Sequence, residues 1–240
     1  MTSQRLNSEA LSYRTYIFDL DGTLVDSLFA LHRSVNLMRS ELGLEAISLD
    51  HCRRYVGNGA VKLVERAIAK DLDRLLERGL GNEARIHDLA YASYMRHFSE
   101  HATDGLRPYP GLISVLDELL SRGCTLACLS NKPDPLVHES LLAAFGEAAQ
   151  RYFQIQRGAR SDSPLKPDPT ALLELLEALN SPHNAAVLVG DSEVDIETAR
   201  NVGIDSIACT WGFRSQEELE QCAPIHLIHS AEEILTCAPN

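Results

Sequence analysis

Residues 15–26 read TYIFDLDGTLVD and combine a short apolar run with three carboxylates. The run is β-branched and aromatic, which predicts a buried strand ending at Asp19. Asp21 and Asp26 follow in the next few residues. If this strand belongs to a parallel sheet, ligands bind beyond its carboxyl end, so we expect the chemistry of the protein to take place at Asp19 and its neighbours.

The spacing of apolar residues in 28–101 predicts helices and no strand. Apolar residues recur at helical spacing from Leu28 to Leu42, and residues 83–98 predict a further helix. Between them, the run Gly57-Asn58-Gly59 interrupts the pattern. We therefore expect an all-helical segment inserted straight after the first strand.

The remainder of the chain alternates between strands and helices. Strands are predicted at residues 125–129, 152–156, 186–189, 206–209 and 226–228. Helices are predicted at residues 112–122, 136–145, 169–179, 193–202 and 215–222, with one more at the C-terminus. Asp168 is placed to cap the helix that begins at Pro169.

This alternation predicts a parallel sheet with helices on both faces. The expected fold class is α/β, a Rossmann-like parallel-sheet core with a helical cap domain inserted after the first strand. The core would comprise residues 1–27 and 102–240, and the cap residues 28–101.

The amino-acid composition argues against several classes of protein, among them disulfide-rich, nucleic-acid-binding and membrane proteins. A chain of 240 residues can bury a core without disulfides, and its six cysteines contain no C-x-x-C pair, which indicates a reducing compartment. The net charge of −12 gives little support for binding nucleic acid or a membrane surface. Residues 1–14 lack the apolar block of a signal peptide, and no apolar run is long enough to span a bilayer, so we expect a cytoplasmic protein.

Polar residues cluster at the ends of the predicted strands. Besides Asp19 and Asp21, these are Ser130-Asn131-Lys132-Pro133, Lys166-Pro167 and Gly190-Asp191 with Asp195. Carboxylates this close repel one another unless a cation lies among them, and hard oxygen ligands suit Mg²⁺. With a lysine and a hydroxyl nearby, such a site suits phosphoryl transfer, in which one carboxylate acts as nucleophile and a second as general acid and base.

Four motifs together resemble the haloacid dehalogenase superfamily. They are DLDGTLVDS at residues 19–27, Ser130-Asn131, Lys166-Pro167 and Gly190-Asp191-x3-Asp195, in the order that the family has them. The dehalogenases of this superfamily lack an aspartate two places after the nucleophile. The presence of Asp21 therefore points to phosphatase or phosphomutase chemistry.

The resemblance implies a role for each of these residues. Asp19 would be the nucleophile and a metal ligand, and Asp21 the general acid and base, with its backbone carbonyl on the metal. Ser130 would hydrogen-bond the phosphoryl group with Asn131 close by, and Lys166 would hold the charges of nucleophile and phosphate together.

The last motif completes this set. Asp191 would ligate Mg²⁺ through its side chain. Asp195 would lie next to the metal ligands and hold them in position without binding the metal itself.

The predicted cap resembles that of bacterial phosphoglycolate phosphatases. The likeness lies in RRYVGNGA at residues 53–60 and LVERA at 63–67. It implies that Gly57, Asn58 and Arg54 meet the carboxylate of 2-phosphoglycolate, a small anionic phosphorylated metabolite. A nucleotide, pyrophosphate or sugar phosphate stays open as substrate, as do a phosphomutase and a non-catalytic binding protein. The sequence fixes neither the oligomeric state, the choice among Mg²⁺, Mn²⁺ and Co²⁺, nor the role of residues 71–85.

Overall fold

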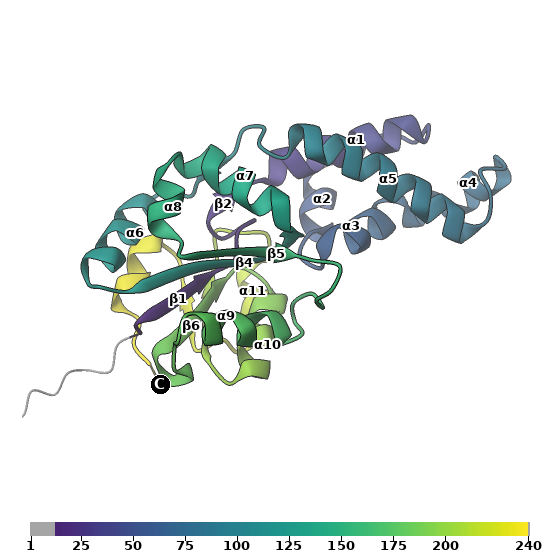
Figure 1. The fold of residues 1–240 in the computed structure, drawn as a ribbon. Coiled ribbons are helices and arrows are strands. Elements are labelled where there is room, and N and C mark those ends of the chain that lie inside the picture. Colours follow the sequence, from purple (N-terminus) through teal and green to yellow (C-terminus); the bar gives the residue numbers. More distant parts are fainter. Residues whose placement is uncertain (1–12, 240) are drawn as a thin grey trace, which may run out of the picture.

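A computed structural model describes residues 13–239 of the chain (Figure 1). The prediction that residues 1–14 hold no signal peptide falls almost wholly outside this range. Within the described range, no helix has both the length and the apolar character that crossing a membrane requires.

A six-stranded parallel sheet lies at the centre, in the order β5-β4-β1-β6-β7-β8. The strands are β1 Thr15–Phe18, β4 Thr125–Pro133, β5 Ile155–Ala159, β6 Ala186–Gly190, β7 Asp205–Cys209 and β8 His226–Ile228. The chain order reverses between β1 and β6, which are neighbours. A ligand site is expected at the carboxyl ends of these two strands.

Alternating side chains of β1 pack against two layers of helices. Tyr16 and Phe18 belong to the apolar cluster on one face of the sheet, and Ile17 to the cluster on the other. The first face is covered by α6 Leu112–Ser121, α7 Asp134–Phe145 and α8 Ala148–Tyr152, and the second by α9 Thr170–Ala178 and α10 Glu193–Val202 (Figure 1). The remaining helices of this part are η2 His183–Ala185, α11 Gln216–Gln221 and η3 Ala231–Thr236. The predicted α/β fold class is confirmed.

The helices between residues 28 and 101 extend from one side of the sheet (Figure 1). They are α1 Leu28–Glu41, α2 Leu49–Tyr55, α3 Gly59–Ile68, η1 Ala69–Asp71, α4 Leu72–Glu77 and α5 Glu83–His101. Their buried apolar side chains form a separate core, to which Ala102, Leu136 and Phe213 contribute from the rest of the described chain. We call this helical segment the cap, and its residue bounds remain a prediction.

Two short strands join the cap to the sheet. β2 Val25–Asp26 pairs antiparallel with β3 Arg107–Pro108, on either side of the helical segment. The expectation that the helices follow the first strand directly is therefore wrong, because β2 intervenes. Strands of two residues are too short to show the alternation that predicts a strand.

Two further predictions are corrected. The strand expected at residues 152–156 lies at Ile155–Ala159, because Tyr152 ends α8 and packs against Phe145. The helix expected from Pro169 begins at Thr170, whose backbone N–H donates to Asp168 at 2.9 Å.

Candidate active site

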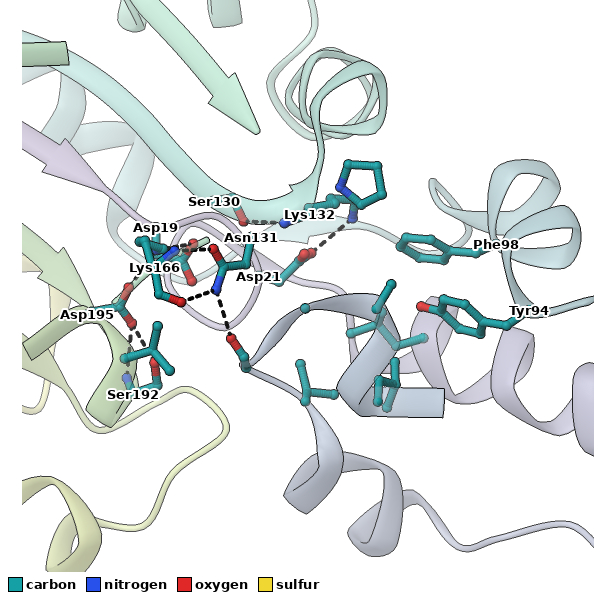
Figure 2. A pocket seen from close by; sticks show the side chains of 18 residues that line it. Asp19, Asp21, Tyr94, Phe98, Ser130, Asn131, Lys132, Lys166, Ser192 and Asp195 are labelled. Atoms are coloured by element: carbon teal, nitrogen blue, oxygen red, sulfur yellow. Dashed lines mark hydrogen bonds and ion pairs between the residues drawn. The ribbon is translucent and has the colours of Figure 1, made fainter. Parts of the chain in front are cut away.

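Most of the residues predicted for the site gather at the carboxyl end of the sheet (Figure 2). With the exception of Asp191, these residues line a cavity of about 50 Å³ between the sheet and the cap. Asp19, Asp21, Ser130 and Lys166 line it on the sheet side. On the cap side the wall is mostly apolar and includes Leu63, Tyr94 and Phe98.

Lys166 links two of the carboxylates. Its ammonium lies 2.9 Å from Oδ1 of Asp19 and donates to Oδ1 of Asp195 at 2.7 Å and to the carbonyl of Leu129 at 2.9 Å. The second oxygen of Asp195 accepts from the backbone and the hydroxyl of Ser192. Both oxygens of Asp195 are thus already bonded, whereas the buried Oδ1 of Asp19 has no partner in hydrogen-bond geometry among residues 13–239.

Asp191 is held rigidly at the end of β6. Its Oδ2 accepts from the backbone N–H of Phe213 at 2.7 Å, and its Oδ1 from the hydroxyl of Thr23 at 3.2 Å. Gly22 has φ +90°, and a Cβ there would lie 2.4 Å from Oδ2 of Asp191. A Cβ on Gly212 would lie 2.3 Å from the same oxygen. Only glycine at both positions leaves room for this carboxylate.

The acidic cluster fits a divalent metal ion. Asp19, Asp191 and Asp195 each offer an oxygen, and these oxygens lie within 4.8 Å of one another. The donors are all carboxylates, which suit a hard cation such as Mg²⁺. Lys166 supplies one positive charge against the three negative charges of the aspartates. The excess negative charge is what a bound cation would neutralise.

Burial and mutual repulsion shift the protonation of this cluster. Burial raises the pKa of Asp19 to about 6, against the opposing effect of Lys166. Burial and the charges of Asp195 and Asp19 raise the pKa of Asp191 well above its usual range. Burial lowers the pKa of Lys166, but the attraction of Asp19 and Asp195 outweighs it and raises that pKa above its ordinary value.

These shifts predict how pH changes the stability of the metal-free protein. A carboxyl group whose pKa is higher in the folded than in the unfolded protein favours folding while it is protonated. Its contribution to the free energy of unfolding is complete below the ordinary pKa and is lost as the pH rises through the raised pKa. A divalent cation offsets the loss, so Mg²⁺ should raise the melting temperature more at pH 7.5 than at pH 5. We expect a difference of about 5 °C, or roughly 2 kcal/mol.

Thermal unfolding in EDTA and in Mg²⁺ at both pH values tests this. Asp191→Asn should reduce the Mg²⁺ effect strongly at pH 7.5. An equal Mg²⁺ effect at the two pH values would contradict the prediction.

An irregular end of β4 brings three consecutive residues to the cavity. The pairing of β4 with β5 shifts register between Leu129 and Pro133, a local irregularity that re-aims side chains. The amide of Asn131 donates to the carbonyl of Lys166 at 2.9 Å and to that of Gly57 in the cap at 3.4 Å. Asn131 therefore fixes the position of Lys166 and touches the cap.

Lys132 is the third of these residues. It belongs to the run Ser130-Asn131-Lys132-Pro133, but the resemblance to the haloacid dehalogenase superfamily gives it no role. Its buried ammonium donates to Oδ1 of Asp21 at 3.0 Å and lies 5.0 Å from the centre of the Phe98 ring in α5 (Figure 2). Nothing in the sequence pairs Lys132 with Phe98, because one lies on β4 and the other on a cap helix.

Two predicted cap contacts are not found at the cavity. Arg54 is exposed and lines a separate hollow with Arg66 and Arg214. The side chain of Asn58 accepts from Arg66 at 2.7 Å instead of facing the cavity. Helical spacing places a residue on a face of α2, but it does not show whether that face meets the cavity. Gly57 does line the cavity.

Comparison with known proteins agrees with this arrangement. The model of the haloacid dehalogenase-like hydrolases matches residues 16–209. Phosphoglycolate phosphatase 1 of Pseudomonas aeruginosa is 33% identical over 230 residues, covering 94% of this chain and 79% of the relative. Phosphoglycolate phosphatase of Rhodobacter capsulatus is 35% identical over 213 residues, covering 88% of this chain and 91% of the relative.

Solved structures share the fold. The crystal structure of a predicted phosphoglycolate phosphatase from Haemophilus somnus matches with a TM-score of 0.81 at 26% identity, covering 93% of this chain and 97% of that one. Fold, motif order and family match coincide over most of the length. The chain belongs to the haloacid dehalogenase-like hydrolases and is a phosphatase of that family.

Proposed function

We propose that this phosphatase hydrolyses 2-phosphoglycolate with the help of Mg²⁺, by way of a phosphate ester on Asp19. The observation that carries the proposal is the small cavity that Asp19, Asp21 and Lys166 line together at the carboxyl end of the sheet. The cavity is bounded by polar residues of the sheet edge and by a mostly apolar cap wall, which suits a small phosphomonoester. The phosphoglycolate phosphatases of Pseudomonas aeruginosa and Rhodobacter capsulatus support the choice of 2-phosphoglycolate.

The first half of the reaction would use both aspartates of the first motif. An oxygen of Asp19 attacks phosphorus while the bond from phosphorus to the leaving oxygen breaks. Asp21, in its protonated form, gives its proton to that oxygen, which becomes the hydroxyl of glycolate. Ser130 and Lys166 hold the phosphoryl oxygens, and Lys166 at 2.9 Å also orients Asp19.

In the second half, Asp21 as a carboxylate takes a proton from water. The water oxygen bonds to phosphorus while the bond to Asp19 breaks, releasing inorganic phosphate. Asp19 and Asp191, with the backbone carbonyl of Asp21, would hold Mg²⁺. When bound, the ion neutralises charge on the phosphoryl group and on the aspartates. Asp195 would keep Lys166 in place, since its oxygens are bonded to Lys166 and Ser192.

Phosphate release tests the proposal directly. The purified protein is assayed with Mg²⁺ and with EDTA on 2-phosphoglycolate, nucleotides, sugar phosphates, pyrophosphate and other phospho-acids. We expect the highest kcat/KM for 2-phosphoglycolate, and a loss of at least about 100-fold in EDTA, because the metal offsets the charge that develops.

Each alternative gives a different result. A preference for another phosphate ester would support the proposed chemistry and contradict 2-phosphoglycolate as the substrate. Release from no ester would discard the chemistry and leave a binding protein.

A further inference from the structure

Lys132 is a buried cation that the proposed mechanism does not use. Its side chain has no exposed surface. A buried ammonium costs free energy unless charged or polar groups face it. Among residues 13–239, its hydrogen-bonding partner is Asp21, and the ring of Phe98 packs beside it. An ammonium has three N–H donors, so Lys132 keeps donor capacity for a ligand in the cavity.

The two buried lysines divide the cavity between them. The chain has four lysines, and of these Lys132 and Lys166 line the cavity. Lys166 lies with Asp19 and Asp195, where the phosphoryl group would be transferred (Figure 2). Lys132 lies on the other side, between Asp21 and the Phe98 ring of the cap (Figure 2).

Because Lys132 contacts Asp21, it lies close to the place where the part of the substrate beyond the phosphate would bind. Asp21 must contact the oxygen that leaves phosphorus, and Lys132 is 3.0 Å from Asp21. In 2-phosphoglycolate, the carboxylate carbon is two covalent bonds from that oxygen. A substrate bound for reaction would thus bring its carboxylate towards the ammonium of Lys132.

The cap wall, within the part of the chain that the structure describes, offers this carboxylate no other cation. Leu31, Val56, Leu63, Tyr94 and Phe98 line it, and Arg54 lies outside. A carboxylate in such surroundings needs a charged donor. We infer that Lys132 binds the carboxylate of the substrate and selects phospho-acids over uncharged phosphomonoesters. This inference rests on the proposed function and assigns the specificity to Lys132 in place of Arg54.

Paired substrates test the inference. We compare 2-phosphoglycolate with its amide, 2-phosphoglycolamide, which has the same shape and lacks the carboxylate charge. Wild-type protein should favour the carboxylate. Lys132→Met should lower the preference about 10–100-fold, mostly by weakening the binding of the phospho-acid, because one charge-assisted hydrogen bond is lost. Lys132→Arg should restore part of the preference. Lys62→Met, an exposed lysine of α3 paired with Glu65, is the control and should change the kinetics of neither substrate.

The outcomes separate the two proposals. If Lys132→Met lowers kcat/KM equally for both substrates, Lys132 acts only through Asp21, and the inference fails while the proposed function stands. If wild-type protein cleaves other esters but not 2-phosphoglycolate, the proposed function fails. Inhibition of wild-type protein by glycolate and glycolamide gives a test that needs no folded variant, and equal inhibition by the two would contradict carboxylate recognition.

Discussion

Asp19→Asn should lower kcat for phosphate release by about 10⁴-fold or more, the largest effect expected of any substitution in this protein. The amide cannot form the phosphate ester, although it fills the same space at the end of β1. Because the substitution is isosteric and removes a buried charge, far-UV circular dichroism should stay close to that of the wild type and the melting temperature in EDTA should not fall.

The measurement has a matched control. Asp50→Asn changes an exposed aspartate in the first turn of α2 and should retain full activity. Rapid quenching during turnover should trap phosphate on wild-type protein and not on Asp19→Asn. Residual turnover above about 1% in a clean preparation, judged against the loss expected for a nucleophile, would contradict the mechanism.

Lys166→Met should have the second largest effect, on both stability and turnover. It removes the ammonium that contacts Asp19 at 2.9 Å and Asp195 at 2.7 Å, and leaves buried carboxylates without this counter-charge. Breaking a buried ion pair in this way costs about 3–5 kcal/mol. We expect that loss in the free energy of unfolding in EDTA, and a decrease of about 10³-fold in kcat.

Denaturant titration and phosphate release measure the two effects. Lys70→Met removes an exposed lysine and should leave both unchanged. Added Mg²⁺ should return part of the lost stability of Lys166→Met, since it supplies the missing positive charge. Unchanged stability in EDTA would mean that the cluster needs no counter-charge from Lys166.

The sheet and the acidic part of the site could be predicted from the sequence. Each central strand is a short apolar run, and Asp19 and Asp191 directly follow two of them. Parallel strands place their carboxyl ends at one edge, so residues far apart in the chain had to meet there. The position of β5 was missed because Tyr152 and Phe153 are as apolar as a strand but pack around Phe145.

The cap side of the site could not be predicted in the same way. Lys132 reaches the cavity because β4 shifts its register there, and its neighbour Phe98 comes from a helix 34 residues earlier in the chain. The resemblance of residues 53–60 to the cap of phosphoglycolate phosphatases implies a substrate contact for Arg54, but the packing of α2 leaves Arg54 exposed. Side-chain direction on a helix depends on which neighbours cover each face, and that information is tertiary.

The pairing of β2 with β3 makes the cap an interchangeable module. The chain leaves towards the helices at Asp26 and returns at Arg107, and these two residues are partners in the antiparallel pair. The two ends of the inserted segment therefore lie side by side in the folded protein, so a longer or shorter insert changes the entropy of closure only slowly. Substrate choice can thus diverge by exchange of the insert, while the aspartates at the sheet edge keep their positions.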